Sequence, residues 1–340
     1  MSATEKRATF SLASIYALRM LGLFLIMPVF ALYAEHLAGV TPLLVGLAIG
    51  IYGLTQALLQ IPFGLLSDRI GRKPVIIGGL ILFAIGSVVA AMSESITGVI
   101  IGRALQGSGA IAAAVMALVA DSTRESSRTK AMALIGMSIG LAFMIALVAG
   151  PILYKSISVP GMFWMTAALA VAGVLVVLFV VPTPGHQAVH RDAEVVSGQV
   201  RRVLRNIDLL RLDVGIFVLH SIMTALFLAY PLLLRDMGGI ASEEHWTVHL
   251  PALVLSIVIM VPFIIMAEKK GKVKQVFLLA IMALALGLFG IGELASGKWG
   301  LVGWLLLFFT AFNLLEASLP SLISKIAPAD AKGTAMGVYS

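Results

Sequence analysis

The sequence predicts an all-α integral membrane protein, and three observations support this. Of its 340 residues, 60% are hydrophobic and only 12% are charged, whereas a soluble domain has about 45–50% apolar and about 25% charged residues. Ten apolar stretches are long enough to cross about 30 Å of hydrocarbon. The loops between these stretches are alternately rich and poor in Lys and Arg. An ordinary soluble enzyme, a disordered chain and a nucleic-acid-binding module are therefore excluded.

The ten apolar stretches follow one another with short polar breaks between them. We place the stretches at 9–33, 43–66, 74–92, 96–120, 129–154, 161–182, 208–234, 246–267, 274–295 and 299–323. The first is too long for the apolar region of a signal peptide, and no convincing small-residue cleavage site follows it. We therefore expect ten membrane crossings.

Basic residues distinguish the two sides of the predicted membrane. Counted in alternate loops from the N-terminus, 19 of the 24 Lys and Arg residues lie on the first side and three on the second. The other two, Arg19 and Arg103, lie inside apolar stretches. Because Lys and Arg gather in cytoplasmic loops, we expect a cytoplasmic N-terminus. The net charge of +7 then reflects topology and not a nucleic-acid partner.

Composition also limits the partners and cofactors. The chain has no cysteine, which excludes disulfides, thiolate metal sites and cysteine nucleophiles. His245 and His249 have the spacing of metal ligands, yet an interfacial polar cluster is the simpler interpretation. We expect no metal and no cofactor. The expected partners are the lipid bilayer and a small-molecule substrate, and the protein is expected to be a monomer.

The longest hydrophilic stretch, 183–207, divides the chain into an N-terminal half, 1–182, and a C-terminal half, 208–340. In this cytoplasmic linker, apolar residues fall at helical spacing beside arginines: Val196, Val200, Val203, Leu204 and Ile207. The pattern fits an interfacial amphipathic helix on an anionic leaflet. A solvated linker fits it equally well.

Two short segments recur in the two halves. Residues 62–72 and 262–272 share Pro, Phe, an acid, a base, Gly and a base in register, and residues 128–132 resemble 332–336. Such parallel repeats indicate two halves of six helices each. The chain holds only four complete crossings of the second half and the start of a fifth. We therefore expect a truncated chain of ten full crossings plus the beginning of an eleventh.

Three motifs carry a family resemblance. Residues 64–73, Gly-Leu-Leu-Ser-Asp-Arg-Ile-Gly-Arg-Lys, resemble the signature loop of the major facilitator superfamily. Residues 103–110 resemble the fourth-crossing motif of its proton-coupled members. A fifth-crossing motif resembles that of the drug:proton antiporter branch and comprises Gly136, Gly140, Gly150 and Pro151. The resemblance implies the fold of that superfamily, alternating access, the proton gradient as energy source and the bacterial inner membrane as location.

The first motif places charges at the cytoplasmic end of the second crossing. Its members, with the acid that closes the fourth crossing, are Gly64, Asp68, Arg69, Gly71, Arg72, Lys73 and Asp121. The helix dipole disfavours a carboxylate at a helix C-terminus, so Asp68 needs a basic partner. We expect Asp121 to lie within reach of Arg72. The resemblance implies that this network latches the cytoplasmic gate; alternatively, the charges only set topology.

Several polar residues lie inside the predicted crossings, where an ionised group costs about 2.5–3.5 kcal/mol on insertion scales. The ionisable ones are proton-coupling candidates: Arg103, Glu316, His220 and Arg19. The others are candidates for the substrate cavity: Gln56, Gln60, Tyr16, Tyr52 and Asn313. Each has an alternative structural role, as an interhelical hydrogen-bonding partner or as packing. Arg19 could instead bind an anionic substrate or pair with a carboxylate.

Glycine-rich segments of the fourth and fifth crossings let helices approach closely. We expect such contacts at Gly102, Gly107, Gly109, Gly136, Gly140 and Gly150, and a bend at Pro151.

The most consistent function is proton-coupled efflux of small amphipathic compounds. A facilitator or proton symporter for a small nutrient is the alternative on the same fold. A membrane enzyme or a channel is a third interpretation, but no catalytic triad, zinc-binding motif, nucleotide loop or filter repeat supports it.

Overall fold

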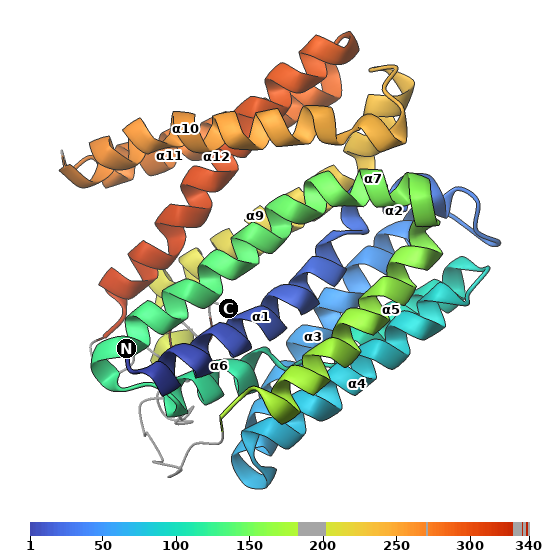
Figure 1. Ribbon diagram of the computed structural model, residues 1–340. Coiled ribbons are helices and arrows are strands. Elements are labelled where there is room, and N and C mark those ends of the chain that lie inside the picture. Colours follow the sequence, from blue (N-terminus) through green and yellow to red (C-terminus); the bar gives the residue numbers. More distant parts are fainter. Residues whose placement is uncertain (183–201, 270, 329–334, 336–337, 339–340) are drawn as a thin grey trace. The chain divides into compact units, whose positions relative to one another are not determined.

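The computed structural model describes residues 1–182, 202–269, 271–328, 335 and 338. In these residues the secondary structure is helical, apart from one isolated bridge between Ala38 and Ser95 (Figure 1). The all-α membrane fold predicted from composition is thereby confirmed.

Nine helical segments of the described chain are long and apolar enough to cross a membrane. The first consists of α1 (Ala3–Phe24) and α2 (Met27–Ala34), and the fourth of α5 (Ile96–Ser108) and α6 (Ala112–Asp121). The others are α3 (Pro42–Ile70), α4 (Arg72–Ala91), α7 (Glu125–Phe179), α9 (Ile207–Asp236), α10 (Trp246–Lys269) after the turn η1 (Ser242–Glu244), α11 (Val273–Phe289) with η2 (Gly290–Leu294), and α12 (Gly297–Ile326).

The difference between nine segments and ten predicted crossings lies in α7. This helix contains both the fifth and the sixth predicted stretch, and Ser158 interrupts it with φ 55° and ψ 178°. The backbone leaves helical geometry at Ser158, seven residues after Pro151, and the bend expected at Pro151 stays a prediction. Pro151 removes one hydrogen bond from the helix without breaking it, whereas a positive φ reverses the backbone direction locally.

Polar residues set several helix starts. Ser2 and Glu5 form a capping box at α1, and the Thr41 and Ser95 side chains accept hydrogen bonds from the first turns of α3 and α5. Gly71 ends α3 with φ 96°, a conformation that glycine adopts without steric cost. Its repeat counterpart Gly271, which follows α10, also has a positive φ of 63°. The sequence repeat is thus a repeat in backbone conformation too.

The chain forms two compact units, and the first contains the described residues up to 182 together with Phe227–Leu232. In this unit α1 lies along α7, α4 packs against α5 and α7, and α3 packs against α5 (Figure 1). Close packing of α3 on α5 depends on Gly107, where a Cβ would lie 2.2 Å from the Tyr52 carbonyl oxygen. Helix α5 can approach α3 this closely only with glycine at that position.

Not every predicted glycine contact is present. A Cβ at Gly150 would lie 2.5 Å from the Leu25 carbonyl oxygen, so this glycine does lie at a close approach. At Gly136 and Gly140 a Cβ would meet nothing within 4 Å among the described residues. Within the first unit, these two glycines therefore do not lie at a close approach of helices.

In the second unit, α10 and α11 both pack against α12. The beginning of α9 meets the end of α12 in a small apolar cluster that includes Leu209, Ile323 and Val203. Most of the predicted linker, residues 183–201, lies outside the described residues. Of the apolar residues in its described part, Val203 is buried in this cluster, whereas Leu204 and Ile207 are exposed, so the interfacial helix stays a prediction. The second repeat segment, 332–336, also lies outside the described residues except for Ala335.

Candidate functional site: an ion network and buried intramembrane charges

Arg72 is the centre of an ion network at the end of the second crossing. Its Nη1 donates to the Ser67 hydroxyl at 2.7 Å and to the Asp68 carboxylate, and its Nε donates to Asp121 Oδ2 at 3.3 Å. Ser67 in turn donates to the Gly64 carbonyl at 2.7 Å. The positive φ of Gly71 reverses the chain, so that Arg72, the first residue of α4, faces back toward α3. The expected contact between Arg72 and Asp121 is present.

The remaining motif residues surround this network. Lys73 Nζ donates to the Val181 carbonyl at 2.6 Å, which ties the start of α4 to the end of the sixth crossing. A Cβ at Gly64 would lie 3.3 Å from that of Ala113, so α3 and α6 are close here. Arg69 is exposed. The motif therefore connects four helix ends, those of α3, α4, α6 and the sixth crossing, with one arginine and one lysine.

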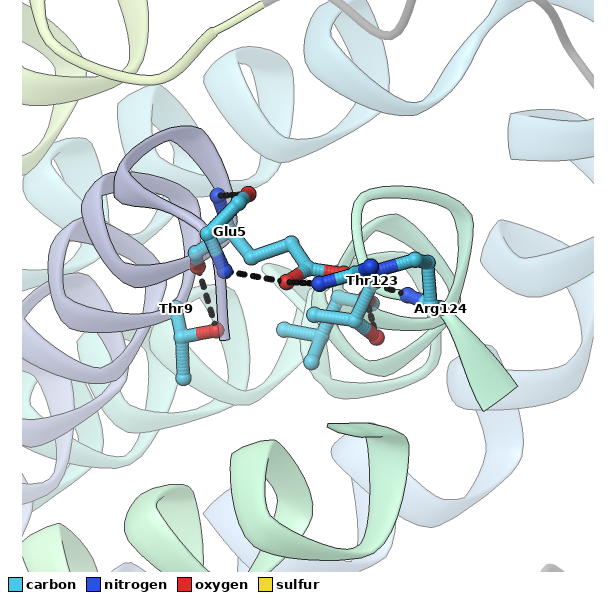
Figure 2. A network of polar contacts seen from close by, with 6 residues as sticks. Glu5, Thr9, Thr123 and Arg124 are labelled. Atoms are coloured by element: carbon cyan, nitrogen blue, oxygen red, sulfur yellow. Dashed lines mark hydrogen bonds and ion pairs between the residues drawn. The ribbon is translucent and has the colours of Figure 1, made fainter. Parts of the chain in front are cut away.

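A second ion network lies nearby and was not predicted (Figure 2). Glu5 Oε1 accepts from the backbone N–H and the Nε of Arg124, both at 2.9 Å, and Glu5 Oε2 accepts from Arg124 Nη2 at 3.2 Å. Arg124 is the N-cap residue of α7 and has no capping side chain of its own. The Glu5 carboxylate of α1 therefore caps α7, where the helix dipole favours an anion.

In this network the Glu5 carboxylate and the Arg124 guanidinium stabilise each other's charged form. Glu5 also accepts from the Ser2 backbone N–H at 2.6 Å, so its carboxylate is fully engaged. Hydrogen bonding to the Glu5 carboxylate raises the pKa of the Arg124 guanidinium above its ordinary value. The capping box Ser-x-x-Glu at residues 2–5 was the available sequence signal. It indicates a helix start, but it does not identify a distant partner.

Two arginines are buried inside the membrane-spanning part of the first unit. Arg19 of α1 is 2% exposed and donates from Nη2 to Gln56 Oε1 at 3.0 Å. Arg103 of α5 is 3% exposed and donates to the Ala48 carbonyl at 3.3 Å and to Gln106 Oε1 at 2.9 Å. The Tyr52 ring lies near both, with its centroid 5.7 Å from Arg19 Cζ and 4.8 Å from Arg103 Cζ. The structure thus joins two proton-coupling candidates through one cavity candidate.

The other cavity candidates of this unit differ in burial. Gln56 and Gln60 are half-buried on one face of α3, and Gln56 is held by Arg19. Tyr16 lies in the apolar core formed mainly by α1, α4, α6 and α7. Tyr16 therefore packs inside the helix bundle of its own unit, which favours the structural alternative for this residue.

A titratable pair connects two helices of the second unit. His220 Nε2 of α9 lies 3.9 Å from Glu316 Oε2 of α12, and both side chains are about half exposed. The His220 ring also contacts Phe312 edge-on at 6.0 Å. One turn from Glu316, Asn313 donates to the Ser256 hydroxyl of α10 at 2.8 Å. His220 and Glu316 are thus neighbours, whereas Asn313 bonds a different helix.

His245 and His249 are buried with their ring centroids 6.3 Å apart. In the described part of the chain no group of three or more His, Asp or Glu residues is arranged to hold a metal ion. His245 Nε2 lies 3.2 Å from the Ile240 carbonyl, so it fixes the turn before α10. This arrangement is that of a structural histidine.

Span-length helices that carry buried charges and an ion network at their ends are typical of multi-pass membrane transporters. This chain belongs to the Major Facilitator Superfamily, whose sequence profile matches residues 12–340. Members of this family are transporters and not enzymes.

Several relatives support the assignment. The Inner membrane transport protein YajR of Escherichia coli (strain K12) is 51% identical over 340 residues, which is 100% of this chain and 75% of the relative. An uncharacterized transporter, BU466, of Buchnera aphidicola subsp. Acyrthosiphon pisum is 34% identical over 100% of this chain and 87% of the relative. The Multidrug resistance protein MdtH of Aeromonas salmonicida is 25% identical over 93% and 79%.

Solved structures support the fold. A bacterial homolog of the human lysosomal transporter Spinster, in an inward-facing and unoccupied conformation, superposes with a TM-score of 0.78 at 14% identity and covers 100% of this chain and 79% of that one. The nucleoside transporter NupG superposes with a TM-score of 0.72 at 14% identity, over 98% and 86%. At these identities the likeness extends to the fold alone.

Proposed function

We propose that this transporter exports small amphipathic compounds in exchange for protons by alternating access, in the bacterial inner membrane with a cytoplasmic N-terminus. The observation that carries the proposal is the His220–Glu316 pair inside the membrane, at 3.9 Å between Nε2 and Oε2. The name of the 25% identical relative, a multidrug resistance protein, supports efflux.

The pair is suited to proton transfer because a carboxylate and an imidazole can each hold or release a proton. Intramembrane ionisable residues typically mark proton relays and substrate pathways. A proton shared between His220 and Glu316 neutralises the carboxylate in one state and leaves an ion pair in another. Both side chains are about half exposed within the second unit, whereas the Glu316 Oε2 atom that faces His220 is buried without a hydrogen-bond partner among the described residues.

The Arg72 network supplies the cytoplasmic gate in this proposal. Its ion pairs connect α3, α4 and the end of α6, and they are partly exposed, with 21%, 45% and 13% exposed side chains for Arg72, Asp68 and Asp121. Partly exposed ion pairs contribute about 0–1 kcal/mol each. Such a latch can hold one state and still be opened by substrate or proton binding.

Proton symport of a small nutrient, or its facilitated diffusion, is the alternative. The same titratable pair serves symport, because the direction of substrate movement does not depend on which group carries the proton. Only transport measurements separate these modes.

The test begins with cells that express the protein, which are profiled for resistance to a panel of amphipathic compounds. Each compound that gives resistance is then followed in proteoliposomes with an imposed pH gradient. Exchange predicts uphill movement of the compound opposite to the protons, and Glu316→Gln should abolish it. Glu293→Gln is the matched control, because Glu293 is an exposed carboxylate of η2.

Three outcomes contradict the proposal. Movement of the compound that does not depend on the pH gradient indicates a facilitator, and movement in the same direction as the protons indicates a symporter. Retained proton-driven exchange in Glu316→Gln removes the pair from the coupling mechanism.

A further inference from the structure

Arg19 has more hydrogen-bond donors than the surrounding described residues satisfy. A guanidinium carries five N–H donors, and only the Nη2 of Arg19 has an acceptor, Gln56 Oε1 at 3.0 Å. The Nε and Nη1 atoms are buried without a hydrogen-bond partner in the described structure. Three N–H groups of a side chain that is 2% exposed are therefore unsatisfied.

A second unsatisfied donor lies on the neighbouring ring. The Tyr52 hydroxyl is buried and has no hydrogen-bond partner among the described residues. The Tyr52 ring centroid lies 5.7 Å from Arg19 Cζ. A tyrosine hydroxyl and a guanidinium can both donate to an oxygen ligand.

Arg103 provides an internal comparison. It is buried to the same extent, yet its Nε has the Ala48 carbonyl and its Nη1 has the Gln106 side chain as acceptors. Gln106 in turn donates to the Ser87 hydroxyl at 2.7 Å. Two of the three Arg103 nitrogens thus have acceptors within the protein, and the Arg103 Cζ lies 4.8 Å from the Tyr52 ring centroid, so a second positive charge lies near this ring.

No carboxylate compensates these two charges. Among the described residues, neither Arg19 nor Arg103 lies within ion-pair distance of an acidic side chain; the acids of the Arg72 and Arg124 networks are engaged there. The Tyr52 and Phe83 rings near Arg19 provide cation–π attraction, but this is weaker than the cost of burying an unpaired ion. A bound anion would provide the missing compensation.

We propose that Arg19, together with the Tyr52 hydroxyl, binds a planar monovalent oxyanion. The planar fork of a guanidinium matches a carboxylate or a nitrate in a bidentate arrangement. The carboxylate belongs to an organic acid, and a nitrate-like ion is the free inorganic form of the same chemistry. The site lies within the first unit, and binding there does not depend on proton exchange.

The test measures equilibrium binding of radiolabelled benzoate to the purified protein in a neutral detergent, with sulfonate buffers as the only other anions. Benzamide is the neutral isostere and should not bind measurably, since it lacks the charge. Competition with nitrate shows whether the site takes an organic acid or a free inorganic ion. If nitrate displaces benzoate at equal concentration, the site is one for the free ion. If benzoate binds at least ten-fold more tightly than nitrate, the site is one for organic acids.

Three variants test the assignment. Arg19→Gln should weaken benzoate binding at least ten-fold, because hydrogen bonds to a charged group are the stronger kind. Tyr52→Phe keeps the ring and should weaken binding about five-fold through the loss of one neutral donor. Lys6→Gln removes an exposed charge from the same helix and should keep binding within about two-fold of the parent.

The proposal is overturned if the parent does not bind benzoate, if benzamide binds as tightly, or if Arg19→Gln binds benzoate unchanged. Where Arg19→Gln does not give a monodisperse protein, Tyr52→Phe decides, and parent-like binding by that variant also overturns the proposal.

Discussion

Gly107→Ala is the substitution for which the structure gives the clearest steric expectation. A Cβ at this position of α5 would lie 2.1 Å from Thr55 Oγ1 and 2.2 Å from the Tyr52 carbonyl oxygen of α3. Favourable contacts begin at about 3.5 Å, so the two helices would have to separate by roughly 1 Å. The Tyr52 carbonyl is backbone and cannot rotate away. The added methyl group must therefore displace α3 itself.

Overpacking of this kind typically costs about 1–3 kcal/mol, and a backbone obstacle places Gly107→Ala at the upper end, near 3 kcal/mol. The melting temperature of the purified protein in detergent should fall by several degrees, since about 1 kcal/mol corresponds to about 2–4 °C in a chain of a few hundred residues. Because the clash displaces Tyr52, whose hydroxyl belongs to the proposed benzoate site, benzoate binding should weaken in parallel. The assay is size-exclusion chromatography after heating at a series of temperatures.

Gly136→Ala is the matched control, because it adds the same methyl group to a helical glycine of a family motif. A Cβ there meets nothing within 4 Å among the described residues, and alanine is the better helix former by about 1 kcal/mol. This variant should melt at or above the parent temperature. The steric reasoning is refuted if Gly107→Ala melts within one degree of the parent, or if Gly136→Ala is destabilised as much.

Three further outcomes are expected. Arg72→Gln removes both ion pairs of the proposed gate, worth up to about 2 kcal/mol together. In that variant, a cysteine introduced by Ala113→Cys into this cysteine-free chain should react with a cytoplasmic maleimide about five- to thirty-fold faster. An unchanged reaction rate would contradict the latch. Glu5→Gln should speed hydrogen exchange at the Arg124 amide, which loses its carboxylate acceptor, and slow exchange there would contradict the capping role. Ser158→Gly should raise the unfolding free energy by about 1 kcal/mol, because glycine relieves the positive φ, whereas Ser158→Ala should not.

The fold was predictable because its strongest signals are local. Apolar stretches of membrane length and the two-sided distribution of basic residues need no knowledge of tertiary contacts. The contact between Arg72 and Asp121 was also predictable, because both residues lie on the same predicted membrane face, where a helix C-terminal carboxylate requires a cation. The positive φ of Gly71 follows from the same motif. In each case the residue type alone restricts what its environment can be.

Other parts of the site depend on which helices pack against one another. No single segment of the sequence indicates this packing. Glu5 and Arg124 are 119 positions apart, and only the packing of α1 beside α7 brings them together. For the same reason, the glycines of one motif separate into Gly150, which lies at a close helix approach, and Gly136, which does not. The break in α7 falls at Ser158, a residue without the helix-breaking chemistry of Pro151.

The two copies of the repeat help to separate what the fold requires from what the proposed gate requires. Gly71 and Gly271 both adopt positive φ, and an acid and two bases recur in register around both glycines. A side chain in the left-handed region costs about 1–2 kcal/mol per residue, and that cost applies in every state of the transport cycle. The ion pairs around Arg72 contribute about 0–1 kcal/mol each, and in the proposed latch they contribute only while the gate is closed. The glycine turn is therefore required in every state, whereas the ion pairs set the equilibrium between the closed and the open state of the proposed gate. A change at Gly71 should accordingly reduce stability, and a change at Arg72 should shift the gate while the fold remains intact.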